Sequence, residues 1–496
     1  MPATPLYDNT ALRVLESRAT RLLGGDAFEL MRRAGRTAWR HALRNWPQAQ
    51  RILVVCGPGN NGGDGYVLAK HALDSGRDAR VVHLEAHAPR SEQARRAFEE
   101  YRSRGGRTEV FGGALPAADL VVDALFGIGF AHAHEPAAQG LIEAMRRHPA
   151  PCLALDVPSG VDAATGAVPG PAVMATRTLE FIAPKPGLAT GAAVQHAGLV
   201  ELLDLDVPGG AYEGIAPRAE LVSSDQLRGW LRPRPRDAHK GMFGRVLCIG
   251  GDHGGGGAIA MCGDAALRCG AGLVEVLTRE AHVPPMLARR PELMVRAVER
   301  AEDLVAPLQR ADVVALGPGL GQELWGRVLF KAAMAAGKPL VLDADGLNLL
   351  AARKTAGALQ DAILTPHPGE AARLLSISTA EVQADRFGAA RALAERHAAV
   401  VVLKGAGTVV AAPGRMPRVV AVGNPGMATG GMGDLLTGVI AALRAQGLAS
   451  FDAATAGVLL HGIAGDAVAR NGGERGMLPT ELLPHLRRFA NPELLK

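Results

Sequence analysis

Short apolar runs alternate along this chain with longer stretches of helical length. The runs are rich in Val, Ile and Leu, end in glycine or aspartate, and cover residues 51–57, 79–85, 118–127, 151–160, 244–251, 311–319, 338–346, 362–370 and 399–407. Continuous apolar runs of this length are typical of strands that are buried on both faces of a sheet. Strands that alternate with helices form βαβ units, so the sequence predicts an α/β protein with mostly parallel sheets.

A break near the middle of the chain indicates two domains. Residues 208–214 (PGGAYEG) end the first series of runs, and residues 231–240 (LRPRPRDAHK) place two prolines among cationic side chains. A chain of 496 residues is long enough for two to four domains of roughly 100–200 residues each. We predict domains at 1–220 and 221–496; the alternative is a loop inside one large domain.

Composition argues against two classes of partner. Aromatic residues make up 4% of the chain and the formal net charge is +5, which suits neither base stacking nor a nucleic-acid backbone. No run approaches about 18 uninterrupted apolar residues, so we expect no membrane-spanning helix. The N-terminus lacks the apolar core of a signal peptide, so we expect the protein in the cytoplasm. The sequence leaves open whether it forms a homo-oligomer.

The first candidate site is the loop GPGNNGGDG (57–65), which follows a predicted strand and opens a predicted helix. Backbone N–H groups at such a helix start can bind phosphate or another anion. Asn60, Asn61 and Asp64 add side-chain oxygens. The alternative is a tight turn in which Asp64 caps the helix. The loop is not a strict GxGxxG dinucleotide motif.

Two further strand ends carry polar residues. Asp123 is followed by the glycine loop 127–129, and Asp156 is followed by Ser159 in a proline-glycine turn. Because the carboxyl ends of parallel strands meet at one edge of a sheet, we expect these groups to form a polar pocket. Each aspartate alone could also be a turn residue or a helix cap.

GPGNNGGDG, VDALFGIG and LDVPSGVD resemble the motifs of the NAD(P)H-hydrate epimerase family over roughly residues 1–220. The resemblance implies a Rossmann-like three-layer domain with Asp156 as its catalytic residue. It implies that the hydrated nicotinamide nucleotide contacts Asn60, Asn61, Gly62, Gly63, Asp64, Gly127, Ile128, Gly129, Phe130, Ala131, His132, Ala133 and Asp156. It also implies a K⁺ site at Asn61, Asp123 and Ser159, and oxygen ligands suit such a hard cation.

One position departs from this family. Relatives often carry a lysine shortly after the glycine loop, where this chain has Ala131. Histidine titrates near neutrality, so His132 or His134 could supply the proton-transfer group instead. The alternative is that both are solvent-exposed loop residues.

The second half of the chain has its own glycine-rich segments. GGDHGGGGA (250–258) lies between a predicted strand and an alanine-rich helix, a position that favours a ligand loop over a linker. GPGLG (317–321) permits close backbone approach. His367 stands between two prolines at a strand end, which predicts a ligand contact; a core histidine is the alternative.

NPGMATGGMGD (424–434) carries the strongest chemical signal. Its glycines precede a helix that we expect to start near Asp434, and amides at that helix start can stabilise a transferring phosphoryl group. Asp434 can accept a proton from an attacking hydroxyl, although an N-cap role is the alternative. Lys404, in VVLKGAGT (401–408), suits a nucleotide phosphate. Together these segments predict phosphoryl chemistry.

GGMGD resembles the anion-hole motif of the ribokinase superfamily. With GPGLG, DADGLN, TPHPGE and KGAGT it is similar to the ADP-dependent NAD(P)H-hydrate dehydratase family over roughly residues 221–496. The resemblance implies a ribokinase-like three-layer domain with catalytic Asp434. It implies that Ala258, Gly319 or Gly321, His367 and Asp434 contact the hydrate, and that the nucleotide contacts Lys404, Gly405, Ala406, Gly407, Thr408 and Gly433. Met432 stands where small residues are usual, and we expect function to be intact because the amide is kept.

Together the two resemblances imply an enzyme that acts on NADH and NADPH hydrated at C6 of the nicotinamide ring. The first domain would interconvert the 6R and 6S epimers. The second would phosphorylate the 6S hydroxyl from ADP with Mg²⁺, and loss of phosphate would restore the double bond and leave AMP. One alternative is a vitamin-precursor kinase fused to a nucleotide-binding module. Another is a nucleotide sensor whose first domain only binds.

Overall fold

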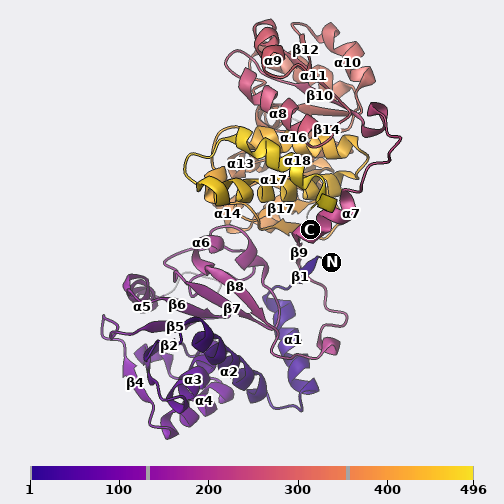
Figure 1. The fold of residues 1–496 in the computed structure, drawn as a ribbon. Coiled ribbons are helices and arrows are strands. Elements are labelled where there is room, and N and C mark those ends of the chain that lie inside the picture. The colour runs from indigo at the N-terminus through magenta and orange to yellow at the C-terminus, as the bar shows by residue number, and fades with distance from the viewer. Residues whose placement is uncertain (1–2, 130–134, 354–357, 495–496) are drawn as a thin grey trace. The chain divides into compact units, whose positions relative to one another are not determined.

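The structure, a computed structural model, describes residues 3–129, 135–353 and 358–494. The chain divides into two compact units, Pro5–Ala219 and Glu220–Lys496, and Met1–Thr4 group with the second. Each unit has its own sheet with helices packed on it (Figure 1). This architecture confirms the predicted α/β class.

The N-terminal unit contains a seven-stranded sheet of order β4-β3-β2-β5-β6-β7-β8, and every neighbouring pair is parallel. Its strands are β2 (Arg51–Cys56), β3 (Asp78–His83), β4 (Arg107–Val110), β5 (Leu120–Ala124), β6 (Cys152–Leu155), β7 (Arg177–Phe181) and β8 (Leu199–Leu203). Its helices are α1 (Asn9–Leu22), α2 (Phe28–Asn45), α3 (Asn60–Asp74), α4 (Glu92–Ser103), α5 (Pro136–Arg147) and α6 (Ala193–Ala197).

Strand β2 explains why the predicted runs are apolar throughout. Ile52, Val54 and Cys56 pack into one core with helices α1 to α4, whereas Leu53 and Val55 pack into another core with α5. Successive side chains of a strand point to opposite faces, so a strand covered on both sides needs apolar residues at every position. The unit therefore has three layers, as predicted.

The chain reverses direction across this sheet between β2 and β5. It adds β3 and β4 on one side of β2 before it returns to β5 on the other side. The Gly57 N–H donates to the Ala124 carbonyl over 3.0 Å, and a Cβ atom at Gly57 would lie 1.7 Å from the Leu125 carbonyl oxygen. Only glycine lets the two strand-end loops approach so closely, and ligands commonly bind at such a reversal point.

The C-terminal unit is built on an eleven-stranded sheet of order β1-β9-β18-β17-β16-β15-β14-β13-β10-β11-β12. β17 is antiparallel to both neighbours, whereas the strands from β16 to β12 in this order are parallel. The strands are β1 (Thr4–Leu6), β9 (Ala219–Leu221), β10 (Arg245–Ile249), β11 (Leu273–Thr278), β12 (Met294–Ala297), β13 (Val313–Leu316), β14 (Leu340–Leu342), β15 (Ala362–Leu364), β16 (Val400–Leu403), β17 (Thr408–Ala411) and β18 (Arg418–Val420).

Helices cover both faces of this second sheet. One core joins Val246 and Cys248 of β10 to α8, α16, α17 and α18, and α11 and α15 contact the sheet outside that core. The helices are α7 (Leu227–Trp230), α8 (Gly256–Arg268), α9 (Val283–Arg289), α10 (Val305–Arg310), α11 (Leu324–Ala335), α12 (Ala344–Ala351), α13 (Pro368–Leu375), α14 (Thr379–Ala384), α15 (Arg386–His397), α16 (Met432–Ala445), α17 (Ser450–Gly472) and α18 (Leu482–Phe489).

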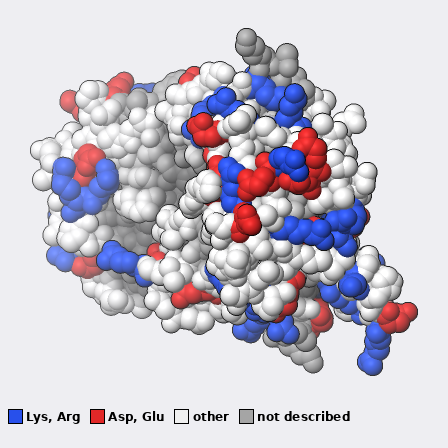
Figure 2. Space-filling model, turned by 90° about the horizontal axis from the view of Figure 1, so that it is seen from above, with Lys and Arg blue, Asp and Glu red and all other residues white. Residues whose placement is uncertain are grey.

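The surface of the molecule carries charges of both signs. On the face drawn in Figure 2, Lys and Arg side chains lie among Asp and Glu side chains. Within the described ranges, no helix is both long enough and apolar enough to cross a bilayer.

Candidate active sites

The first predicted loop forms the opening turns of α3. Gly59 is the N-cap, and the helix begins at Asn60 directly after the strand-end turn. A Cβ atom at Gly62 would lie 1.9 Å from the Gly57 carbonyl oxygen, so packing already requires glycine there. Gly62 and Gly63 are buried inside the helix. Some glycines of this motif are therefore needed for close packing.

A cavity of about 790 Å³ lies beside this helix start. Its lining includes most of the residues predicted for the first site, namely Asn60, Asn61, Asp64, Gly127, Ile128, Gly129 and Asp156. Gly62 and Gly63 are not among its lining residues. The predicted residues Phe130, Ala131, His132 and Ala133, together with His134, lie outside the described residues. The two strand-end loops therefore do meet around one cavity.

Asp64 does not cap α3. It lies in the second turn of the helix and is 9% exposed. Burial, followed by the neighbouring carboxylates of Asp156 and Glu16, raises the pKa of Asp64 well above its usual range. The cavity therefore carries an acidic wall.

Asp156 directly follows β6 and has a strained backbone conformation, with a φ of 67°. Its Oδ1 lies 2.5 Å from Lys185 Nζ and accepts a hydrogen bond from the Phe181 N–H over 3.2 Å. A Cβ atom at Gly127 would meet Asp156 Oδ2 at 3.3 Å, so the glycine loop lies directly over the carboxylate. Strained residues of this kind concentrate at functional sites.

Lys185 is a site residue that the sequence analysis missed. The side chain is buried and donates to the carbonyls of Phe181 and Ala183 as well as contacting Asp156. Glu180 accepts the Lys185 backbone N–H over 2.7 Å, and burial raises the pKa of Glu180 to about 7. A signal existed, because Lys185 stands between two prolines after a strand, as His367 does.

Asp123 and Ser159 bind each other and are both buried. Ser159 donates to Asp123 from its hydroxyl over 2.6 Å and from its N–H over 2.7 Å. Burial raises the pKa of Asp123 to about 6, against the effect of these hydrogen bonds. Both polar side-chain atoms of Asn61 are buried and lack a hydrogen-bond partner among the described residues. A buried amide without a partner among these residues is compatible with a bound ligand, and its oxygen suits a hard cation.

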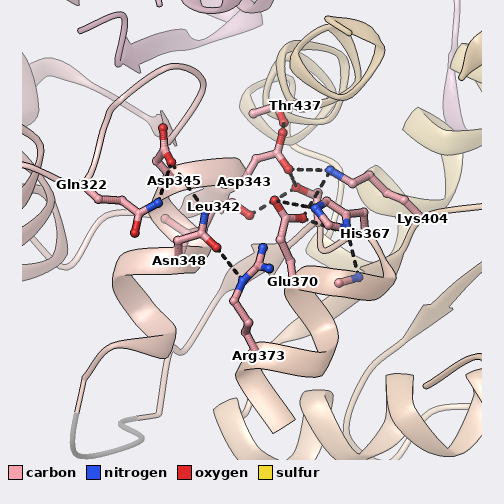
Figure 3. Close-up of polar contacts among 12 residues, drawn as sticks. Gln322, Leu342, Asp343, Asp345, Asn348, His367, Glu370, Arg373, Lys404 and Thr437 are labelled. Carbon is pink, nitrogen blue, oxygen red and sulfur yellow. Dashed lines mark hydrogen bonds and ion pairs between the residues drawn. The ribbon is translucent and has the colours of Figure 1, made fainter. Parts of the chain in front are cut away.

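In the C-terminal unit, two glycine loops meet where the chain reverses between β10 and β13. The N–H groups of Gly251 and Asp252 donate to the carbonyls of Pro318 and Gly319 over 3.0 and 2.6 Å. Ala258 lies in the first turn of α8, which this loop opens. The Gly321 N–H donates to Asp345 over 2.9 Å, and Asp345 also binds the Gln322 side chain (Figure 3).

Asp343 connects four segments behind this site (Figure 3). It follows β14 and accepts hydrogen bonds from Lys404 Nζ at 2.7 Å, from the Thr365 hydroxyl at 2.8 Å and from the Thr437 hydroxyl at 2.8 Å. It is 1% exposed. The sequence analysis gave it no role, although it begins the DADGLN motif. The ends of three neighbouring strands and helix α16 are thereby fixed to one carboxylate.

Asp343→Asn is expected to destabilise the C-terminal unit by about 3–5 kcal/mol, because it leaves the Lys404 ammonium without its buried partner. Hydrogen exchange of the β14 to β16 amides would report this loss for that unit alone. The double variant Asp343→Leu/Lys404→Met removes both charges and should regain much of the protection. Equal losses in the single and double variants would contradict the ion-pair explanation.

Glu370 and His367 lie beside this ion pair (Figure 3). Glu370 is 3.9 Å from Lys404 Nζ, and burial raises the pKa of Glu370 to about 7 although Lys404 opposes the shift. The His367 ring caps α13 by accepting the Gly369 N–H over 3.0 Å, and its side chain is 51% exposed. Burial, Lys404 and Arg373 lower the pKa of His367. His367 is therefore a neutral surface residue and not a core histidine.

Asp434 is the third residue of α16, which begins at Met432 with Gly431 as its N-cap. The N-cap alternative for Asp434 is therefore wrong. Burial and the Asp343 charge raise the pKa of Asp434 to about 6, although Lys404 opposes the shift. Met432 is buried in the core, which accommodates its larger side chain.

Lys404 reaches the start of the same helix. A Cβ atom at Gly433 would lie 3.3 Å from Lys404 Nζ and 3.6 Å from an Asp343 carboxylate oxygen. Burial alone would lower the pKa of Lys404, but Asp343 and Glu370 outweigh burial and raise it. A charged ammonium and a helix N-terminus thus converge where Asp434 lies, an arrangement that favours an anionic ligand.

The loop after Lys404 presents exposed and buried residues in turn. Gly405 and Ala406 are exposed, whereas Gly407 and Thr408 are buried. The Thr408 hydroxyl donates to the Gly405 carbonyl over 3.0 Å and closes the turn. The buried Arg386 guanidinium donates to the carbonyls of Leu403 and Lys404 from behind. Contacts from the buried residues Arg386 and Thr408 therefore fix the loop, whereas Gly405 and Ala406 are exposed to solvent.

Two family models match this chain. The model described as NAD(P)H-hydrate dehydratase matches residues 246–488, and the model described as YjeF-related protein N-terminus matches residues 27–187. A ribokinase-like superfamily protein from Enterococcus faecalis superposes with a TM-score of 0.51 at 32% identity, covering 54% of this chain and 94% of that one. This likeness supports the ribokinase-like fold of the C-terminal unit.

Full-length relatives carry the same two regions. The bifunctional NAD(P)H-hydrate repair enzyme Nnr of Escherichia coli is 45% identical over 495 residues, which cover 100% of this chain and 95% of the relative. The enzyme of that name from Coxiella burnetii is 44% identical and covers 99% of this chain and 100% of the relative. Likeness of this extent, across both sheets and both sites, means that the chain belongs to the family of bifunctional NAD(P)H-hydrate repair enzymes.

Proposed function

We propose that this enzyme restores NADH and NADPH that have been hydrated at C6 of the nicotinamide ring. The N-terminal unit epimerises the 6R and 6S hydrates, and the C-terminal unit dehydrates the 6S hydrate with ADP. The observation that carries the proposal is the convergence of Asp434, the α16 N-terminus and the Lys404 ammonium at one strand edge. Phosphoryl transfer needs a proton acceptor and groups that stabilise the negative charge of the phosphate. Asp434 can accept the proton, and the helix N-terminus and Lys404 can stabilise the charge.

Dehydration uses phosphate because hydroxide is a poor leaving group. Asp434 accepts the proton of the 6S hydroxyl while the hydroxyl oxygen bonds to the β-phosphorus of ADP and the bond to AMP breaks. The C6–O bond then breaks and phosphate leaves with the bonding electrons. Loss of a proton from C5 restores the ring double bond. In this scheme Ala258, Gly319, Gly321 and His367 surround the hydrate.

The adenine nucleotide is assigned to the loop from Lys404 to Thr408 and to Gly433. The exposed position of Gly405 and Ala406 supports this assignment, because it brings this part of the loop within reach of a ligand. The described residues include no group of three or more His, Cys, Asp or Glu side chains that could hold a metal ion. Mg²⁺ is expected to enter with the nucleotide phosphates, whose charge it neutralises.

Epimerisation inverts C6, which carries a hydroxyl group next to the ring nitrogen. Asp156 is assigned the proton transfer and Lys185 positions it through their 2.5 Å contact. The substrate is assigned to the cavity formed by Asn60, Asn61, Asp64 and the loop from Gly127. Lys185 also supplies a cation in a site that lacks the family's loop lysine at Ala131.

K⁺ is assigned to Asn61, Asp123 and Ser159, where it would supply a fixed positive charge beside the substrate. The orphaned amide of Asn61 and the carboxylate of Asp123 support this assignment. We expect epimerisation to require K⁺ and dehydration of pure 6S hydrate to be indifferent to it. Asp123→Ala should weaken hydrate binding in the first unit and spare the second. Equal epimerase rates and hydrate affinities with and without K⁺ would contradict the site.

A single assay tests the whole proposal. A mixture of 6R and 6S hydrates with ADP and Mg²⁺ should be converted completely to NADH, with recovery of its absorbance and release of AMP and phosphate. A stable phosphorylated product would instead indicate a vitamin-precursor kinase. Binding of hydrate without epimerisation would indicate a sensor domain. We expect the enzyme to act in the cytoplasm.

A further inference from the structure

Glu16 lines the cavity of the N-terminal unit from a segment outside every predicted motif. It lies on α1, whose residues Leu12, Leu15 and Ala19 are buried in the main core of the unit. These core contacts fix the helix, and Glu16 takes its place in the cavity wall together with Asp156. Helix α1 thus adds the carboxyl group of Glu16 to the cavity that Asp156 also lines.

Four ionisable side chains, each from a different segment, lie close enough to Glu16 to shift its pKa or to have their own pKa shifted by it. Arg13 lies one turn earlier on α1, Asp64 comes from α3, Asp156 follows β6 and Lys185 follows β7. The Lys185 ammonium is already committed to Asp156 and to two carbonyl groups. Within residues 3–129 and 135–353, no hydrogen bond or ion pair is found for the Glu16 carboxyl. Glu16 therefore has no close partner that would favour its charged form.

The two carboxyl groups consequently differ in environment. Asp156 is paired with a cation, whereas burial, followed by the Asp156 charge, raises the pKa of Glu16 to about 7 against the effects of Lys185 and Arg13. A paired carboxylate and an unpaired, partly buried carboxyl in one cavity form the arrangement that enzymes use to obtain a base and an acid from two carboxyl groups.

Resting on the proposed epimerase function, we infer that Glu16 is the proton donor of epimerisation and that Asp156 is the proton acceptor. Glu16 protonates the C6 hydroxyl, the C6–O bond breaks with its electrons to give water, and the ring nitrogen lone pair forms a C6=N bond. A water molecule then adds to the other face of C6, its oxygen forms the new bond, and Asp156 takes its proton. The reaction is redox-neutral, and proton exchange with solvent resets both groups.

The test compares Glu16→Gln with Glu16→Asp in the full chain. Gln keeps the size and hydrogen bonding of the side chain but cannot deliver a proton, so kcat for epimerisation of pure 6R hydrate should fall by about 10²–10⁴-fold while KM changes little. Asp keeps the carboxyl group and should retain more activity than Gln. Glu99→Gln, an exposed change on α4, is the matched control and should behave like wild type.

The pH profile separates proton donation from a structural role. A donor must be protonated, so wild-type epimerisation should decline as the pH rises through about 7, the value to which the pKa of Glu16 is raised. Glu16→Gln should lose this decline. Near-normal kcat in Glu16→Gln, or a lower kcat with an unchanged pH profile, would overturn the inference. If wild type itself does not epimerise the hydrate above the spontaneous rate, the proposed function fails and not the assignment of Glu16.

Discussion

Asp434→Asn should lower ADP-dependent dehydration of the 6S hydrate by about 10²–10⁴-fold, the usual contribution of a general base. Asparagine keeps the shape of the side chain in the first turn of α16 but cannot accept the hydroxyl proton. The change also removes a negative charge beside Lys404, so ADP should still bind. Single-turnover measurement of NADH formation, together with an ADP binding titration, would separate the two effects.

The pH dependence of the wild-type enzyme gives a second readout of Asp434. A base must be ionised, and burial raises the pKa of Asp434 to about 6. Dehydration should therefore be full above this value and decline as the pH falls through it. Asp237→Asn, an exposed change in the segment before β10, is the matched control. Near-normal turnover by Asp434→Asn would remove Asp434 from the mechanism.

Asp156→Asn should abolish most epimerisation and leave dehydration of pure 6S hydrate at its normal rate. With a mixed hydrate, the variant should consume the 6S form and then stall at the rate of spontaneous epimerisation. A general-base loss of about 10²–10⁴-fold makes this a two-phase progress curve that absorbance can follow directly. Impaired turnover of pure 6S hydrate would show that the two sites are not separable.

A folding defect must be distinguished from lost chemistry in this variant. Asparagine leaves Lys185 buried beside a neutral partner, and an uncompensated buried charge costs about 3–5 kcal/mol. Asp156→Asn/Lys185→Met removes both charges and should restore stability without restoring epimerisation. If the double variant regains activity, proton transfer does not pass through Asp156.

The sequence predicted nine of the eighteen strands in the described residues, because buried parallel strands have a local signature. Each of the nine apolar runs overlaps one strand. These strands are β2, β3, β5 and β6 in the first sheet and β10, β13, β14, β15 and β16 in the second. β7 was missed because the buried Glu180 interrupts its apolar run. β8 was missed because it is an edge strand with exposed apolar residues, such as Leu199, that carry no core pattern.

The site residues also fall into two groups, those that local sequence predicts and those that it does not. Glycine loops at strand ends can be predicted from local spacing, and the cavity does collect Asn61, Gly127 and Asp156. Lys185 and Glu16 could not be predicted similarly, because a charged residue becomes a site residue only when distant segments bury it. The N-cap alternative for Asp434 failed for a local reason, because Gly431 caps the start of α16 with a left-handed backbone conformation.

The four-segment attachment at Asp343 has a consequence for how the nucleotide would bind. Thr437 ties α16 to the same carboxylate that holds Lys404 and Thr365. The donors aimed at phosphate are then set in place when the protein folds, and little conformational entropy is left to lose on association. ADP should therefore bind with little change in the positions of these donors. We expect any ordering of the backbone on binding to be confined to the exposed residues Gly405 and Ala406.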